Sequence, residues 1–309
     1  RDNTGQLIFQ ANQSAGSGGA IAIQNATLDI VYNQSVEFVG NSAAERGGAI
    51  ASYADSTVRI HDNGKVSFVD NSAAYASAIY SEGVLSIRNN ENVLFSGNGA
   101  AAVHLLIDTT KSYSNPAHLS LSAAEDKSIL FDGTGIRTER SVGSARILID
   151  LNADYADGSL PQTGDIVFRG AGSKSELFSS TVTLHNGSLM LQQQSKMLVD
   201  GQYVNHANTI ISDGASFTVD AINGEANSFL QVSDSFVRTQ NINLILAKAR
   251  FENSVLQNQN GALNDAVVRV DSQSVLTLAG GNTFDGTIAL RNGGELSLSG
   301  HNVLNGTLE

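Results

Sequence analysis

The sequence is poor in the residue types that most often build a chemical site. Its 309 residues include no Cys, no Trp and only 2 Pro, and only 16% are charged. Without cysteine there can be no disulfide framework and no cysteine-ligated metal site. A chain without thiols also suits export, because it cannot become cross-linked in an oxidising compartment.

Basic residues are also scarce. Lys and Arg number 18 against 30 Asp and Glu, which gives a net charge of -12 and a sequence pI of about 4.8. Nucleic acids and anionic membranes bind basic surfaces, so this balance argues against both as partners. No run of 18 apolar residues occurs, so no membrane-spanning helix is predicted. The chain opens at Arg1 with neither Met nor a signal-peptide pattern, which predicts an exported mature segment.

What the sequence does contain is an internal repeat. A phenylalanine is followed three residues later by an asparagine at four places: Phe9/Asn12, Phe38/Asn41, Phe68/Asn71 and Phe95/Asn98. A patch of small residues follows each pair: Gly18-Gly19-Ala20-Ile21, Gly47-Gly48-Ala49-Ile50, Ala76-Ser77-Ala78-Ile79 and Ala100-Ala101-Ala102-Val103. The phenylalanines are 29, 30 and 27 residues apart. This period, with β-type residues between the marks, predicts a stacked solenoid.

Residues 47–71 serve as the example of one coil. Three short runs alternate apolar and polar residues, as strands do: Ala49-Ile50-Ala51, Val58-Arg59-Ile60 and Val66-Ser67-Phe68. Turn residues such as Asn63-Gly64 separate them. The sequence therefore predicts an all-β protein, a right-handed parallel β-helix with three strands per coil and roughly 10 to 14 coils. The phenylalanines should stack inside, and the asparagine amides should bond one another and the turn backbone.

The repeat pattern divides this single solenoid into three segments. Residues 1–103 carry the repeat marks, residues 104–165 read as a loop-rich continuation, and residues 166–309 read as regular coils. Asn-Gly and Asp-Gly turns recur in the last segment, as at Asn186-Gly187 and Asp213-Gly214. Hairpins use the same dipeptides, so a local antiparallel meander is the alternative to further parallel coils.

The tandem Phe-x-x-Asn and Gly-Gly-Ala-Ile marks resemble the paired motifs of chlamydial polymorphic outer-membrane proteins and related autotransporter passengers of Gram-negative bacteria. The stretch from Thr163 to Phe168 is similar to the passenger core of that family. The stretch from Val275 to Phe284 resembles the repeats that lead toward its translocator barrel. The resemblance implies an adhesin passenger, exported through the outer membrane and displayed at the bacterial cell surface. It also implies that the membrane is reached only through a barrel outside these residues.

Three functions are compatible with such a passenger. The first is attachment to host cells or extracellular matrix, through a fibronectin-type glycoprotein or a glycosaminoglycan lying along an extended polar face. The second is a structural stalk that self-associates. The third is a glycan-active enzyme, which would need clustered carboxylates or a bound calcium. Binding of the isolated chain to matrix components separates the first from the second, and a cleft with two carboxylates identifies the third.

Ligand contacts are expected where loops interrupt the rigid coils. Arg137 and Arg140, with Arg146, form the basic cluster of the middle segment, although a solvated loop of mixed charge is the alternative. Asp154 and Asp157 follow Asp150 in an acidic loop that lacks the alternate-residue spacing of a calcium site. The predicted ligand-binding residues are therefore Arg137, Arg140, Asp154 and Asp157. Tyr53, Tyr75 and Tyr80 near coil corners are further candidates for stacking on sugar rings.

Catalytic, metal and cofactor motifs were not found in the sequence. The histidines show no short-range pairing that would indicate a metal site: His61, His104, His118, His185, His206 and His301. Gly16-Ser17-Gly18-Gly19 has no following Lys and no helix pattern, so it is read as a turn and not as a phosphate loop. The sequence has no Gly-x-Ser-x-Gly motif. We therefore predict no catalytic residue, no metal and no cofactor, and a protein that is not an enzyme.

Overall fold

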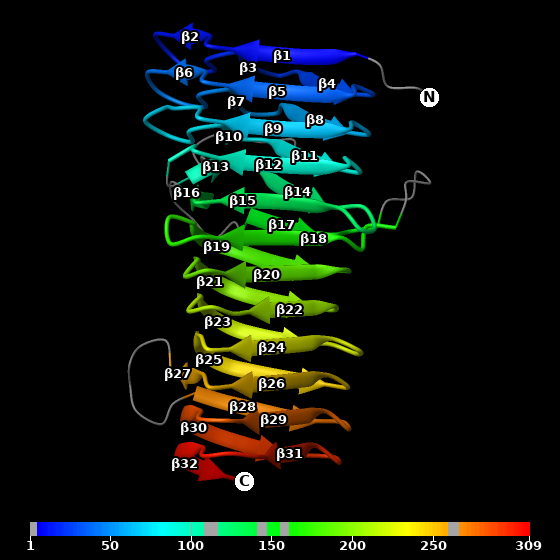
Figure 1. Cartoon of the computed structure of the whole chain (residues 1–309), viewed down its shortest axis with the longest axis vertical. Coiled ribbons are helices and arrows are strands. Elements are labelled where there is room, and N and C mark those ends of the chain that lie inside the picture. The colour runs from blue at the N-terminus through cyan, green and yellow to red at the C-terminus, as the bar shows by residue number, and fades with distance from the viewer. Residues whose placement is uncertain (1–4, 100, 108–116, 141–146, 155–160, 259–265) are drawn as a thin grey trace.

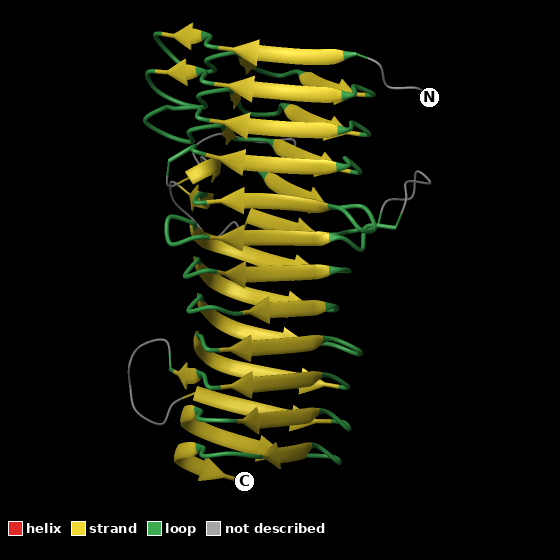
Figure 2. Ribbon diagram, in the orientation of Figure 1, coloured by secondary structure: helices red, strands yellow, loops and turns green. Residues whose placement is uncertain are grey.

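A computed structural model describes residues 5–99, 101–107, 117–140, 147–154, 161–258 and 266–309. The described residues form strands, turns and loops without a helix, and every strand pairing among them is parallel (Figure 2). The antiparallel meander is therefore wrong for the described residues. The all-β parallel solenoid predicted from the repeats is confirmed.

One long sheet of twelve strands, which we call the front sheet, runs the length of the molecule (Figure 1). Its strands are β1 (Gln6–Gln10), β5 (Ser35–Val39), β9 (Lys65–Val69), β12 (Asn92–Ser96), β15 (Ser128–Asp132), β18 (Asp165–Arg169), β20 (Ser188–Gln192), β22 (Asn208–Ile211), β24 (Phe229–Ser233), β26 (Lys248–Glu252), β29 (Val275–Ala279) and β31 (Glu295–Leu298). One strand per coil makes twelve coils, and at about 4.8 Å per coil the stack is about 50 Å long.

The other two faces belong to a second sheet. In the first five coils each face has its own strands. One face is β3 (Ile21–Ile23), β7 (Ile50–Ser52), β10 (Ile79–Ser81), β13 (Ala101–Ile107) and β16 (Gly135–Arg140). The other is β4 (Thr27–Val31), β8 (Thr57–His61), β11 (Val84–Arg88), β14 (His118–Ser122) and β17 (Ile147–Leu151). A small pair, β2 (Gln13–Ser14) and β6 (Ser42–Ala43), lies at a corner. These coils have the predicted three strands.

In the later coils the two faces are joined. β19 (Lys174–Leu184) pairs with β16 at one end and with β17 at the other. The same bent form recurs in β21 (Lys196–Asn205), β23 (Ser216–Gly224), β25 (Phe236–Ile245), β30 (Thr283–Leu290) and β32 (Val303–Leu308), whereas β27 (Val255–Gln257) and β28 (Ala266–Asp271) are separate. The coils are shorter here: Phe229 pairs with Lys248, an offset of 19 residues, against 29 for Gln6 and Ser35. In β19 and β21 the two faces meet at a register shift within the strand, so one strand turns the corner without a loop.

The solenoid is right-handed. In Figure 1 the front strands run from right to left, the strands behind them run from left to right, and the chain descends from the N-terminus to the C-terminus. This direction of winding matches the hand of nearly all crossover connections between parallel strands.

Stacked phenylalanine rings occupy the centre of the first six coils. The rings of Phe9, Phe38, Phe68 and Phe95 lie face to face at 4.6, 4.7 and 4.8 Å between centroids, with planes within 7°. The predicted stack is confirmed, and it continues beyond the repeat marks. Phe131 lies 4.7 Å from Phe95, and Phe168 lies 4.6 Å from Phe131. The insertions in the middle segment therefore do not disturb the register of the front sheet.

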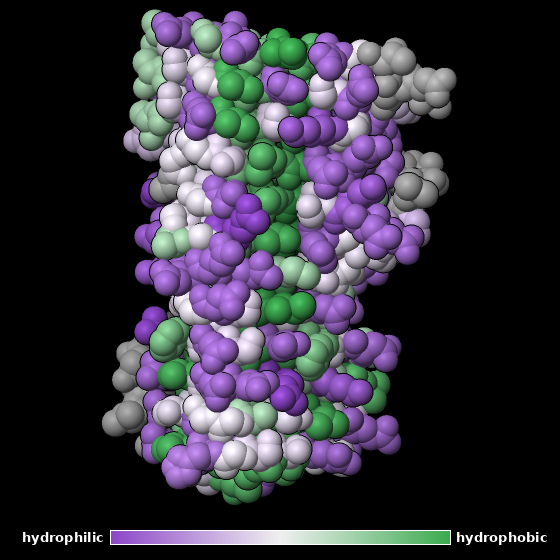
Figure 3. Space-filling view, viewed as in Figure 1, coloured by the Kyte–Doolittle hydropathy of each residue, from purple (hydrophilic) through white to green (hydrophobic). Residues whose placement is uncertain are grey.

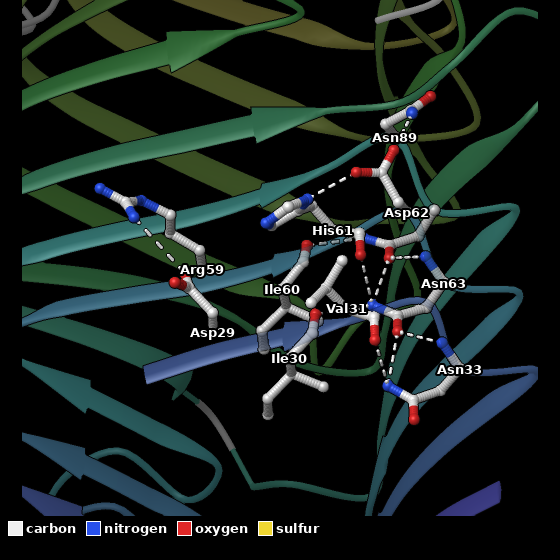
Figure 4. Close-up of polar contacts among 11 residues, drawn as sticks. Asp29, Ile30, Val31, Asn33, Arg59, Ile60, His61, Asp62, Asn63 and Asn89 are labelled. Carbon is white, nitrogen blue, oxygen red and sulfur yellow. Dashed lines mark hydrogen bonds and ion pairs between the residues drawn. The ribbon is translucent and has the colours of Figure 1, made fainter. Parts of the chain in front are cut away.

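Two ladders of asparagine amides support the corners. In the first, predicted from the repeats, the side chain of Asn41 donates to Oδ1 of Asn71 (3.0 Å) and to the carbonyl of Phe9 (2.9 Å). The second ladder was not predicted and joins Asn33, Asn63 and Asn90. Figure 4 shows its step from Asn33 to Asn63. In both ladders the side-chain amide of one asparagine donates hydrogen bonds to a backbone carbonyl and to the asparagine of a neighbouring coil. These bonds satisfy buried polar groups where the strands end.

The two glycines of the Gly-Gly patch are required for different reasons, one for backbone conformation and one for close packing. Gly47 has a φ of 62°, in the left-handed region that favours glycine. Gly48 has a close neighbour, because a Cβ added to it would lie 2.2 Å from the carbonyl oxygen of Ser77 in the next coil. The patch therefore marks a corner at which one coil closes directly upon another.

Candidate functional site

Three outward side chains line up on the face formed by β10, β13 and β16. Tyr80 pairs with His104, and His104 pairs with Arg137, in consecutive coils. Their neighbours Ile79, Val103 and Ile136 belong to the main core, so the alternation of strands points these three side chains outward. Tyr80 and His104 are nevertheless only 1% and 3% exposed. Other groups on the outside of the solenoid must therefore cover them.

The cover comes from the corner segments of the second and third coils. Arg46 and Tyr75 pair there, and the Arg46 guanidinium lies over the Tyr80 ring at 4.9 Å from its centroid. The His104 ring is 5.9 Å from Tyr80 and 6.2 Å from Tyr75, and Tyr53 contacts the edge of Tyr80. The result is an aromatic cluster outside the main core.

Charged groups surround this cluster. Glu82 is buried, accepts a hydrogen bond from the Tyr80 hydroxyl (2.9 Å) and lies 3.4 Å from Arg46 Nη1. Arg137 Nη2 lies 3.6 Å from Glu139 Oε2. The two arginines thus add positive charge beside the aromatic rings, and each has one acidic neighbour.

His104 is the unusual member of the site. Its Nε2 atom is buried and has no hydrogen-bond partner among the described residues, although Glu139 Oε2 lies 3.4 Å away. Burial, with the positive charges of Arg137 and Arg46, lowers the pKa of His104 to about 4. The imidazole is therefore neutral at physiological pH. A buried polar atom without a partner in a charged cleft is a recognised signal of a functional site.

A pocket of about 260 Å³ opens beside these residues. It is lined by Ala73, Ala74, Tyr75, Ala76, Ser77, Ala101, His104 and Arg137. Tyr75 is 55% exposed, so its ring is accessible from solvent. The pocket thus combines a floor of small side chains, an aromatic wall, a guanidinium and a neutral imidazole. A ligand of one ring with a polar or anionic substituent matches this set.

A larger cavity of about 490 Å³ lies further along the solenoid. It is lined by Asn227, Ser228, Phe229, Leu246 and Lys248. Among the described residues that line it, Lys248 alone is charged, and neither a second charged group nor a histidine lies beside it in the lining. The smaller pocket is therefore the better candidate site.

The structure does not bring the four predicted contact residues together in one described site. Arg137 lies in β16 and lines the pocket, so the expectation that it belongs to a loop is wrong. Arg140 ends the same strand, and its side chain lies outside the described part of the structure. Asp154 is exposed in the connection after β17, at the opposite edge of the solenoid from β16 (Figure 1). Asp157 lies outside the described residues. No contact among the described residues joins Arg137 to Asp154.

The three tyrosines predicted to stack on sugar rings differ in their exposure to solvent. Tyr53, Tyr75 and Tyr80 do lie in one cluster, but the ring of Tyr80 is buried in β10 and cannot stack on a ligand. The partners Arg46 and His104 were missed. The one signal that could have found them is the column along the coils, yet its offsets are irregular because the coils differ in length.

The acidic loop is also corrected by the structure. Asp150 lies in β17, where its two oxygens accept hydrogen bonds from Nε2 of His118 and Nε2 of His185, each at 2.7 Å. The ring of His185 is 6.2 Å from that of His206. These histidines are therefore not scattered, although they are far apart in sequence. No group of three or more acidic or histidine residues in the described ranges could hold a metal ion.

The Asp150 cluster predicts a pH dependence. The hydrogen bond from His118 lowers the pKa of Asp150, burial opposes this, and the hydrogen bond from His185 adds to it. A lowered carboxyl pKa contributes stability above the unfolded value of about 3.9, and this contribution is lost as the pH falls through the folded pKa. We expect Asp150→Asn to cost no more than about 1 kcal/mol at pH 7, because the pair is partly exposed. Urea unfolding should show the difference shrink below about pH 4.

Asp154→Asn is the matched control for that experiment, since Asp154 is an exposed aspartate of the same segment. It should leave the stability unchanged at every pH. A difference between wild type and Asp150→Asn that stays constant down to pH 2 would contradict the assigned hydrogen bonds.

The fold and its corner marks define a parallel β-helix built from tandem repeats, and comparison with known proteins finds relatives with the same repeats. The family model for the Chlamydia polymorphic membrane protein repeat matches residues 6–24 and 35–53. The probable outer membrane protein PmpG of Chlamydia muridarum is 30% identical over 295 residues, 89% of this chain and 27% of that protein. PmpI of Chlamydia trachomatis is 33% identical over 161 residues, 51% of this chain and 18% of that protein. No solved structure matches significantly.

The chain carries repeats of the polymorphic outer-membrane protein family, a group of autotransporters, as its Phe-x-x-Asn marks predicted. It spans at most about a quarter of the length of these relatives. The relatives are named as outer membrane proteins. Their names confirm the predicted location at the outer membrane and surface of the bacterium. Among the described residues, no helix has the length and hydropathy to cross a membrane.

Proposed function

We propose that this chain is the ligand-binding part of an adhesin, which attaches the bacterium to host cells or to extracellular matrix. The observation that carries the proposal is the pocket of Tyr75, His104 and Arg137, which places an exposed aromatic ring, a buried imidazole nitrogen without a hydrogen-bond partner and a guanidinium side by side. His104 and Arg137 are held on the registered strands β13 and β16, so these two side chains lose little conformational freedom when a ligand binds. The ligand class is a matrix glycoprotein of the fibronectin type or a glycosaminoglycan.

An extended ligand suits the shape of the molecule. Twelve coils present side chains at a regular spacing along one axis. A polymer that contacts several coils gains affinity from each further contact, because the later contacts form within the same complex. The net charge of -12 means that attraction by bulk positive charge cannot hold the ligand. Local groups such as Arg137 must supply the contact.

Self-association is the second candidate function, and one surface favours it. Half-buried aliphatic side chains occupy the outer middle position of five successive front strands: Leu94, Leu130, Val167, Met190 and Ile210. Figure 3 shows apolar side chains gathered along the middle of this face with polar ones on both sides. A second copy of the chain is the partner that such a stripe would take in a stalk or aggregate.

One set of measurements separates these functions. We expect the purified chain to bind at least one of immobilised fibronectin, laminin, collagen or a glycosaminoglycan panel, and to sediment as a monomer at micromolar concentration. Concentration-dependent association without matrix binding would favour the stalk. We also propose binding without turnover, because Glu82 and Asp150 are both committed to hydrogen bonds. Release of unsaturated sugars or reducing ends from the same glycans would refute that part.

A further inference from the structure

The pocket contains hydrogen-bonding capacity that the protein itself does not use. His104 Nε2 is buried without a hydrogen-bond partner, and His104 lines the pocket together with Arg137. The contact of Arg137 with Glu139, at 3.6 Å, exceeds normal hydrogen-bond length. A ligand that reaches both groups would therefore pair a buried nitrogen and a guanidinium at once. This gain depends on the chemistry of the ligand.

The charges favour an anionic group. Arg137 lines the pocket with its guanidinium 3.6 Å from Glu139, beyond normal hydrogen-bond length, in a chain whose net charge is -12. A planar guanidinium binds carboxylate in a fork of two parallel hydrogen bonds. A neutral imidazole can donate a third bond from Nε2 to the same carboxylate or to an adjacent hydroxyl.

Size and shape restrict the rest of the ligand. The volume of about 260 Å³ is below the usual range for drug-sized molecules, so the pocket accepts about one ring. The exposed ring of Tyr75 forms one wall, and the residues on either side of it in the lining have small side chains: Ala73, Ala74, Ala76 and Ser77. An aromatic face beside polar groups suits a ligand with one apolar face and a polar edge.

We propose that this pocket binds a single carboxylate-bearing sugar, a sialic acid or a uronic acid residue, with its carboxylate on Arg137 and His104 and its ring against Tyr75. The inference deepens the proposed adhesin function and rests on it. It makes the acidic sugar the unit of a longer glycan that this face recognises.

The test uses small glycosides of defined charge with the whole chain. Binding is measured by ligand-observed NMR for methyl glucuronide, methyl sialoside, neutral methyl glucoside and the methyl ester of the glucuronide. We expect one or both acids to bind at least tenfold more tightly than the glucoside and the ester. The acid that binds identifies the source of the carboxylate, and either acid supports the proposal. The proposal is overturned if neither acid binds more tightly than the glucoside and the ester.

Variants locate the interaction. Arg137→Ala should weaken binding of the acid at least tenfold. Arg250→Ala is the matched control, because Arg250 has a similar intrastrand pair with Glu252 on β26 and should leave binding unchanged. Glu139→Gln should strengthen binding, since it removes the competing negative charge next to Arg137 and His104. His104→Phe keeps an aromatic ring and should weaken binding. Circular dichroism and urea midpoints check that each variant is folded.

Each outcome can be assigned to one proposal. Matrix binding that persists in Arg137→Ala, with no acidic sugar bound by wild type, overturns the sugar site and leaves the adhesin proposal standing. Sugar binding without any matrix binding supports the site and counts against the adhesin. Equal losses in Arg137→Ala and Arg250→Ala would show nonspecific charge attraction and overturn the site.

Discussion

Replacing Phe68 by alanine is expected to lower the free energy of unfolding by about 3 to 5 kcal/mol. Phe68 is fully buried between two parallel rings, at 4.7 Å from Phe38 and 4.8 Å from Phe95. Alanine would leave a cavity in the middle of the stack. The coils above and below are held apart by the hydrogen bonds of the front sheet, so the cavity cannot close.

Urea denaturation followed by circular dichroism measures this effect. Phe236→Ala is the control, because Phe236 lies on β25 with 44% of its surface exposed. We expect that change to cost less than about 1 kcal/mol. A cost below about 1 kcal/mol for Phe68→Ala as well would place the ring outside the core and would contradict the stack.

Replacing Asn71 by alanine is expected to cost about 3 kcal/mol, through lost hydrogen bonds and not through lost volume. Asn71 Oδ1 accepts from the backbone N–H and the amide of Asn41, each at 3.0 Å. Its own amide donates to the carbonyl of Phe38 at 2.9 Å. All these groups are buried between coils, where water cannot replace the missing partner, so each pays a desolvation penalty.

Asn243→Ala provides the comparison for that variant. Asn243 also bonds an asparagine of the neighbouring coil, Asn223, at 2.8 Å, but it lies on a half-exposed outer position of β25. Water can satisfy the groups that it leaves, so a loss of no more than about 1 kcal/mol is expected. Equal losses of stability in Asn71→Ala and Asn243→Ala would show that burial does not increase the contribution of the first ladder to stability.

The sequence predicted the front sheet well because its evidence is local and repeated. The offsets of 29, 30 and 27 residues between phenylalanines are the register of the front strands, as the pairing of Phe9, Phe38, Phe68 and Phe95 shows. The repeat marks did not predict that Phe131 and Phe168 continue the stack. No asparagine follows Phe131 or Phe168 at the third position, since Thr134 and Ala171 stand there. A phenylalanine ring fills the core in all six of these coils. The asparagine amide is needed only where two asparagine-bearing corners stack on each other.

The candidate site was predictable only in fragments. Arg137 and the tyrosines were singled out, but each was assigned to a loop or a corner without its partners. Glu82 and His104 carried no signal, because a buried acid and a neutral buried histidine look like surface residues in sequence. Asp150 was read as part of a loop, since nothing near it in the chain marks His118 and His185 as its partners.

The form of a single coil follows from the local sequence pattern. Alternation at a period of two sets which side chains face inward, and the recurring Phe, Asn and Gly marks set which coils stack on which. Which side chains meet on the outside depends on the three-dimensional stacking of the coils. In the front sheet the offset between paired strands varies from 19 to 37 residues, as the pairs Phe229–Lys248 and Ser128–Asp165 show. Neighbours across coils therefore have no constant spacing, and the meeting of Tyr75, His104 and Arg137 follows from how far each insertion displaces the chain before it rejoins the stack.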